Sequence, residues 1–217
     1  MTDPQYPKFT RSPLTRKKLG DKVPRRGGII AQPIAKAVLK VLGWKVVGDI
    51  PNVPKAVFLA LPHTSNIDGL FAIPSILALD LDIKIMGKES LFKVPVLSPF
   101  VRWAGIIPID RGKKGSVLQT SIDRFKSEKP LLLGLSPEGT RAYNKEWKTG
   151  FYYIAAGAGV PIVPVAMDYK TKEVRFMQPV LPTGDMAIDI PKILEQYKGV
   201  VPKHPERLSQ PLKDVNK

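Results

Sequence analysis

Short apolar runs alternate with helical patterns along most of this 217-residue chain. The apolar runs are only five or six residues long, which suits buried strands better than helices. Between them, apolar residues recur at helical spacing, as Leu118, Ile122 and Phe125 do. Such alternation predicts an α/β fold, with helices flanking a mixed, largely parallel sheet in a single domain. The expected strands are 56–61, 83–87, 105–109, 131–135 and 162–167, and the expected helices are 29–44, 115–128 and 150–159.

Composition excludes several kinds of chemistry. The chain has no cysteine, which rules out disulfides, thiolate catalysis and cysteine-based metal sites. Its two histidines, His63 and His204, are too far apart in sequence for a zinc-binding spacing. Lysine and arginine total 34 against 19 acidic residues, a net charge of +15. Such a surface favours anionic partners: nucleic acid, an anionic membrane face, or phosphorylated substrates.

The two ends of the chain are polar. Residues 1–28 carry eight basic and two acidic residues and few apolar ones, so we expect a flexible basic tail, either simply solvated or tethered to a phosphate-bearing surface. Residues 200–217 are expected to form a polar surface tail, which leaves 29–199 as the folded domain. The first residues lack the apolar core of a signal peptide, and no apolar run reaches the ~18–20 residues that span a bilayer. A cytosolic protein, free or lying on a membrane, is expected.

The segment 29–44 has both an apolar and a polar face. Lys36 and Lys40 lie on one stripe of the expected helix, whereas Ile34 and Val38 lie on another. Packing against the core explains this pattern, and so does a helix that lies in a membrane interface.

The stretch 61-LPHTSNIDGL-70 follows the first expected strand. One interpretation is a helix cap with an incidental histidine, because threonine, serine, asparagine and aspartate all favour helix starts. The other is an acid–base pair, in which Asp68 fixes the tautomer of His63 and the second ring nitrogen takes a proton from a hydroxyl. The carboxyl end of a strand is where α/β proteins place their ligands.

The stretch 136-SPEGTRA-142 follows another expected strand. It is consistent with a polar turn, since Pro137 and Gly139 are turn residues. Glu138 and Arg141 at a strand end could equally form a site that holds an anion through the guanidinium.

Together, the His-x₄-Asp and Pro-Glu-Gly-Thr-Arg segments resemble the glycerolipid acyltransferase family, whose best-known members acylate lysophosphatidic acid. Two further blocks stand in the family's order, 105-GIIPIDR-111 and 160-VPIVPVA-166, and 88-KES-90 is similar to a Lys-Glu-Leu element that often precedes Asp-Arg. The resemblance covers about residues 55–170 and implies the fold of the glycerol-3-phosphate acyltransferases.

The resemblance also implies roles for individual residues. His63 would deprotonate the acceptor hydroxyl, which then attacks an acyl thioester directly, and Asp68 would orient His63. The acceptor phosphate would be bound by Lys88, Arg111, Glu138, Gly139, Thr140 and Arg141. Val160 and Pro161 would belong to the acyl-donor region. No metal and no cofactor is implied, apart from acyl-CoA or acyl carrier protein as co-substrate.

Some positions differ from the family pattern and leave the acceptor open. Pro62, Ile67 and Ile109 stand where asparagine, tryptophan and an aromatic residue are common. A lysophospholipid, most simply 1-acyl-glycerol-3-phosphate, is the expected acceptor, with another lysolipid or hydroxyl-bearing lipid as the alternative. The expected location is peripheral, on the cytoplasmic membrane face. A non-enzymatic basic module for nucleic acid or anionic lipid would explain the charge, but recognised nucleic-acid motifs are absent.

Overall fold

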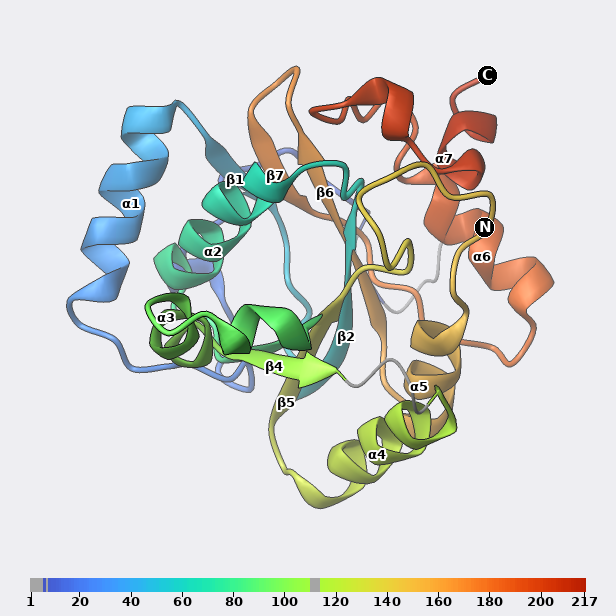
Figure 1. Cartoon of the computed structure of the whole chain (residues 1–217), viewed down its shortest axis with the longest axis horizontal. Coiled ribbons are helices and arrows are strands. Elements are labelled where there is room, and N and C mark those ends of the chain that lie inside the picture. Colours follow the sequence, from blue (N-terminus) through green and yellow to red (C-terminus); the bar gives the residue numbers. More distant parts are fainter. Residues whose placement is uncertain (1–5, 7, 110–113) are drawn as a thin grey trace.

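Seven strands form one sheet in the computed structural model, which describes residues 6, 8–109 and 114–217 (Figure 1). The order across the sheet is β1-β7-β6-β2-β5-β3-β4. All neighbouring strands are parallel except β6 and β7, which are antiparallel. The strands are β1 (Lys45–Gly48), β2 (Lys55–Leu61), β3 (Ile83–Lys88), β4 (Ile106–Ile109), β5 (Leu131–Leu135), β6 (Ile162–Asp168) and β7 (Glu173–Phe176).

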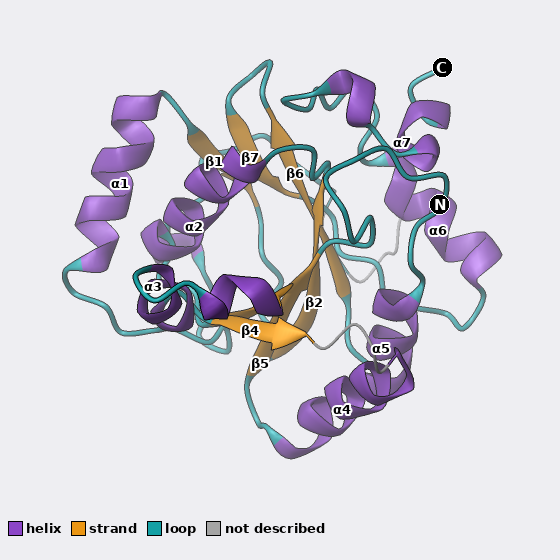
Figure 2. Ribbon diagram, in the orientation of Figure 1, coloured by secondary structure: helices purple, strands orange, loops and turns teal. Residues whose placement is uncertain are grey.

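Helices cover both faces of this sheet (Figure 2). Side chains alternate along a strand, so β2 sends Phe58 to one face and Val57, Leu59 and Leu61 to the other. The first face packs against α1 and α2, and the second against α4, α5, α6 and α7. The helices are α1 (Ala31–Leu42), α2 (Gly69–Ala78), α3 (Leu97–Trp103), α4 (Lys114–Ser127), α5 (Gly150–Ala158), α6 (Met186–Glu195) and α7 (Gln210–Asp214).

The expected α/β class, the five expected strands and the three expected helices are confirmed. Strands β1 and β7 were not predicted because each is four residues long and mixes apolar residues with charged residues or glycine, so neither forms an apolar run in the sequence. No helix of the described ranges is both long and apolar enough to cross a bilayer.

The expectation of a flexible basic tail is wrong for residues 8–28. Leu14, Leu19 and Val23 are buried in the first core cluster. The side chain of Arg16 also forms a 2.9 Å ion pair with the buried carboxylate of Asp80. Three well-spaced apolar side chains anchor this segment although most of its residues are polar.

The polar C-terminal tail is likewise part of the domain. Leu208 and Leu212 are buried in the second core cluster. Ser209 is buried too, and its hydroxyl accepts a 3.1 Å hydrogen bond from the indole of Trp147. Residues 200–217 therefore pack against the body of the protein instead of forming a surface tail.

Candidate active site

Three of the sequence-predicted segments meet at one edge of the sheet. Strands β2, β5 and β3 are parallel neighbours, so their carboxyl ends lie side by side. His63 follows β2, Glu138 follows β5, and Lys88 is the last residue of β3. Arg111 follows β4 but lies outside the described residues.

His63 and Asp68 form a hydrogen-bonded pair, with 2.9 Å between His63 Nδ1 and Asp68 Oδ2. A short 3₁₀ helix at Asn66–Asp68 brings them together. Its cap is reciprocal: the Ser65 hydroxyl accepts from the Ile67 amide, and Asp68 Oδ2 accepts from the Ser65 amide at 3.0 Å. The helix cap and the acid–base pair are therefore one structure, because the same carboxylate serves both.

Tyr169 holds the other oxygen of this carboxylate. Its hydroxyl donates a 2.6 Å hydrogen bond to Asp68 Oδ1. The Tyr169 ring meets Trp44 and Phe71 edge-on, and these two rings stack with centroids 3.9 Å apart. Burial and the contact with Asp68 raise the pKa of Tyr169 well above its usual value. The hydroxyl therefore remains a donor at physiological pH.

Tyr169 was not expected from the sequence, because 101 positions separate it from Asp68. The available signal was its place directly after β6, the parallel neighbour of β2. Polar residues that follow adjacent parallel strands meet at one edge of a sheet.

Glu138 is buried next to the backbone of His63 and is only 3% exposed. Its Oε2 accepts a 2.7 Å hydrogen bond from the His63 amide. Burial raises the pKa of Glu138, and this hydrogen bond partly offsets the rise. The structure thus gives Glu138 a contact with the His63 backbone, whereas the resemblance implied a contact with the acceptor phosphate.

The next residues form an exposed turn. Gly139 has a φ of +63°, a left-handed conformation that favours glycine. The side chains of Thr140 and Arg141 are exposed, and the described residues offer Arg141 no hydrogen bond or ion pair. Lys148, which the sequence did not single out, lies across this turn, with Nζ 2.9 Å from where a Cβ on Gly139 would stand. Two cations therefore flank the turn.

Val160 and Pro161 lie at the opposite edge of the sheet. They precede β6, and the Pro161 carbonyl accepts a 2.9 Å hydrogen bond from the Val57 amide near the start of β2. Because β2 and β6 run parallel, His63 is at the far end of these strands. The structure does not bring the expected acyl-donor residues to the histidine.

The C-terminal segment contacts the His63 loop from another side. The His204 amide donates to the Thr64 hydroxyl at 3.2 Å, and Arg207 donates to the Thr64 carbonyl at 3.3 Å. This support for the loop was hidden by the polar composition of residues 200–217.

The geometry suits proton abstraction from an external group. With Nδ1 engaged by Asp68, the other ring nitrogen of His63 has no hydrogen-bond partner in the described ranges and can accept a proton. The His63 side chain is 28% exposed, against 1% for Asp68. The carboxylate that orients the ring is thus shielded from solvent, while a substrate hydroxyl can reach the imidazole. A general base needs this access, because it must lie within hydrogen-bond distance of the proton it removes.

Comparison with known proteins identifies the family. The model of the family described as Acyltransferase matches residues 45–168, more than half of the sequence. The chain belongs to this family.

Curated relatives agree with this assignment. A 1-acyl-sn-glycerol-3-phosphate acyltransferase from Salmonella typhimurium is 28% identical over 59% of this chain and 53% of the relative. One from Saccharomyces cerevisiae is 30% identical over 70% of this chain and 51% of the relative. The chain thus spans about half the length of these relatives.

Among solved structures, the 1-acyl-sn-glycerophosphate acyltransferase PlsC from Thermotoga maritima has the same fold. It matches with a TM-score of 0.54 and 24% identity, over 76% of this chain and 74% of that one.

Proposed function

We propose that this protein is an O-acyltransferase that moves a fatty acyl group from a thioester to the free hydroxyl of a lysophospholipid. The acceptor is 1-acyl-glycerol-3-phosphate, and the product is phosphatidic acid. The observation that carries the proposal is the His63–Asp68 pair, with 2.9 Å between Nδ1 and Oδ2, a partly exposed imidazole and a buried carboxylate.

In this mechanism His63 removes the proton of the acceptor hydroxyl as its oxygen attacks the thioester carbonyl. The carbon–oxygen bond forms, the carbon–sulfur bond breaks, and the thiol departs with a proton. Asp68 fixes the ring and stabilises the positive charge that His63 acquires. Because the acyl group passes directly to the acceptor, the chemistry needs no cofactor.

The acceptor phosphate is placed at the exposed turn after Glu138. Arg141 and Lys148 are cations with no ion pair in the described part of the chain, and a phosphate provides the negative charge they lack. Lys88 ends the next strand and adds a third cation at the same edge. The donor, acyl-CoA or acyl carrier protein, is also anionic and suits a chain of net charge +15.

A lipid acceptor requires access to a bilayer, for which α1 and α3 offer apolar side chains. Val41 on α1 is 86% exposed, and Val96, directly before α3, is 90% exposed. The segment before α1 also contacts α3, because the guanidinium of Arg26 lies 5.2 Å from the Trp103 ring centroid. We therefore propose peripheral binding to the anionic cytoplasmic face of a membrane, with α1 as an interfacial helix.

Product analysis tests the proposed reaction. Purified protein is incubated with a panel of lysolipids and with acyl-CoA or acyl carrier protein, and the products are identified by mass spectrometry. Phosphatidic acid should form fastest from 1-acyl-glycerol-3-phosphate. Faster acylation of a lysolipid without a phosphomonoester would favour the alternative acceptor class.

A non-enzymatic binding module remains the contrasting hypothesis. It predicts nucleic-acid retention in a filter-binding assay and no release of thiol from either donor. It gives no reason for the buried Asp68 carboxylate to be aligned with His63, so we favour the enzyme.

A further inference from the structure

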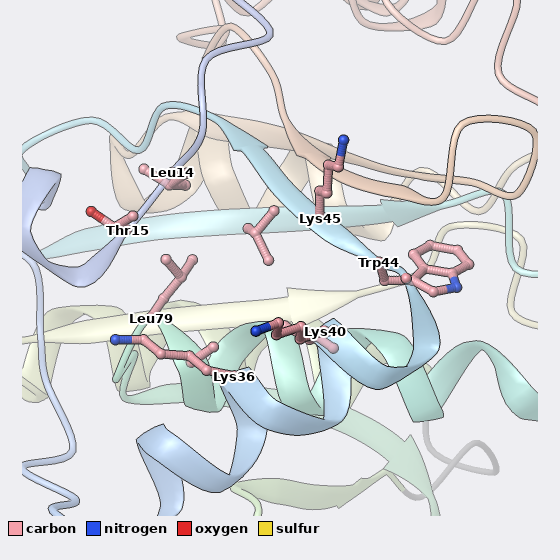
Figure 3. Close-up of a pocket in the computed structure, with 11 residues that line it drawn as sticks. Leu14, Thr15, Lys36, Lys40, Trp44, Lys45 and Leu79 are labelled. Carbon is pink, nitrogen blue, oxygen red and sulfur yellow. The ribbon is translucent and has the colours of Figure 1, made fainter.

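The loop that carries His63 is held on its Asp68 side by aromatic packing. Tyr169 donates to the Asp68 carboxylate and meets the ring of Trp44 edge-on. Trp44 in turn stacks on Phe71 and lines a cavity of about 400 Å³ between α1, β1 and the N-terminal segment (Figure 3). These contacts fix the carboxylate, whereas the backbone next to His63 is held by another part of the chain.

Thr64 directly follows His63, and the C-terminal segment binds its hydroxyl and its carbonyl. Thr64 is 1% exposed, and its hydroxyl accepts a 3.2 Å hydrogen bond from the His204 amide. Its carbonyl accepts a 3.3 Å hydrogen bond from the Arg207 guanidinium. Because Glu138 binds the amide of His63 itself, the backbone is fixed on both sides of the imidazole.

The same segment also holds the loop between β5 and α5, which carries Arg141. The Gln210 amide donates to the Asn144 carbonyl at 2.9 Å. The buried Ser209 hydroxyl accepts a 3.1 Å hydrogen bond from the Trp147 indole. Figure 1 shows the red C-terminal segment beside this yellow loop. The C-terminal segment therefore contacts the loop on which the proposed phosphate site stands.

Residues 204–210 thus bridge the two halves of the candidate site. The bridge is short, and Leu208 anchors its middle in the second core cluster. It lies outside residues 45–168, which match the family model. An acceptor reacts only when its hydroxyl meets the base while its phosphate stays bound, so the separation between His63 and Arg141 must match the acceptor. A bridge between their two loops controls that separation.

We propose that residues 204–210 form a positioning strap, which sets the separation between His63 and the Arg141 loop to fit a glycerol phosphate. Arg207 is the positioning residue at the His63 end, and Ser209 is the positioning residue at the Arg141 end. Each acts through another residue, Arg207 through Thr64 and Ser209 through its partner on the loop. The inference rests on the proposed function, because the acceptor defines the length that the strap must match.

The first experiment changes the His63 end of the strap. Arg207→Ala should lower kcat on the order of 10-fold and leave the KM for 1-acyl-glycerol-3-phosphate unchanged, because the base is displaced while the phosphate site is kept. Arg207→Lys should recover most of the loss, since the Thr64 carbonyl accepts a single hydrogen bond from this side chain. The matched control is Arg124→Ala, which removes one positive charge and a 2.8 Å ion pair with Glu128 at the end of α4. This control should keep the native constants.

The second experiment changes the Arg141 end. Trp147→Phe removes the indole N–H that donates to Ser209 and keeps an aromatic ring next to Phe151 and Tyr197. The KM for phosphate-bearing acceptors should rise about 3–10-fold, while kcat and the rates with phosphate-free acceptors stay unchanged. The two ends of the strap thus have different kinetic signatures, which a general loss of stability would not produce.

A measurement without turnover separates the strap from the proposed reaction. The chain has two histidines, so comparison with His204→Ala assigns the imidazole resonances of His63 by NMR. Arg207→Ala should shift these resonances, and Arg124→Ala should leave them in place. If they shift in this way but native protein makes no product from any acceptor, the hold of the strap on His63 is supported and the proposed reaction fails.

Several results would overturn the strap. Native kcat and native His63 resonances in Arg207→Ala would show that the contact with Thr64 positions nothing. A raised KM with unchanged kcat in the same variant would make Arg207 a substrate-binding residue instead. An equal loss of kcat in Arg124→Ala would show a general effect of charge. An unchanged KM in Trp147→Phe would remove the Arg141 end from the proposal.

Discussion

Replacing Tyr169 with phenylalanine tests whether Asp68 is held for catalysis. The change removes the hydroxyl that donates to Asp68 Oδ1 at 2.6 Å and keeps the ring that contacts Trp44 and Phe71. A hydrogen bond to a charged group contributes ~1.5–3 kcal/mol. Without it, the carboxylate directs more of its charge toward the imidazole, which stabilises protonated His63 over the neutral base.

The expected result is a shifted pH–rate profile. If about half of that free energy stabilises the protonated imidazole relative to the neutral one, the acid limb of the kcat/KM profile moves to higher pH by about 0.5–1 unit. This follows because 1.36 kcal/mol corresponds to one pH unit. Other charged groups nearby stay in place: Glu138 at the His63 amide, Arg207 at the Thr64 carbonyl, and Lys203, 5.9 Å from the Tyr169 ring centroid.

The assay measures kcat/KM across the pH range for native protein and the Tyr169→Phe variant. Tyr153→Phe is the matched control, because that side chain is exposed on α5 and its hydroxyl has no hydrogen bond in the described residues. If the Tyr169→Phe and native profiles superimposed, Tyr169 would be a packing residue and the reasoning would be refuted.

Three further predictions follow from the site and its supports. Arg141→Ala should raise the KM for phosphate-bearing acceptors by about 10–100-fold, with Arg141→Lys restoring only part if the contact is bidentate; equal slowing of phosphate-free acceptors in steady-state assays would argue against it. Burial raises the pKa of Glu138 above 4.5, so the folded protein binds this proton more tightly than the unfolded chain does. The resulting contribution to the free energy of unfolding is complete below ~pH 4.5 and is lost as pH rises through the raised pKa. Urea denaturation at several pH values should therefore show Glu138→Gln becoming more stable relative to native protein as pH rises. A difference in unfolding free energy that stayed the same at every pH would be evidence against this. Deleting residues 1–28 removes the buried side chains of Leu14, Leu19 and Val23 and exposes the core surface they cover. Burial of each contributes ~1.5–3 kcal/mol, so the melting temperature should fall strongly. An unchanged melting temperature would contradict the packing of this segment.

The sequence predicted the central fold because its strands are buried on both faces. β2 and β6 are almost entirely apolar, so their length and composition identify them without knowledge of their neighbours. Strand β1 has one exposed and one half-buried residue among four, and it is stabilised by pairing with β7 and with the segment around Pro13, both distant in the sequence. Leu14, Leu19 and Val23 show the same limit, since their burial depends on a surface formed by distant residues.

The same distinction applies to the site. His63 and Asp68 are only five positions apart, so a single turn brings them into contact and their spacing in the sequence already indicated the pair. The partners that hold this pair come from far along the chain: Tyr169 directly follows β6, and Glu138 lies in the turn after β5. Whether a carboxylate after a strand turns inward, as Glu138 does, depends on the packing around it. The chain's own residue types do not determine that direction.

The most direct test of the account is the acylation rate of His63→Ala. Removing a general base lowers a rate by ~10²–10⁴-fold, so the variant should make phosphatidic acid from 1-acyl-glycerol-3-phosphate and acyl thioester at least ~100 times more slowly than native protein. Its fold and acceptor binding should persist. His204→Ala is the control, because the His204 amide, which this change keeps, makes the contact with Thr64. A His63→Ala protein that formed product at nearly the native rate would contradict the central claim.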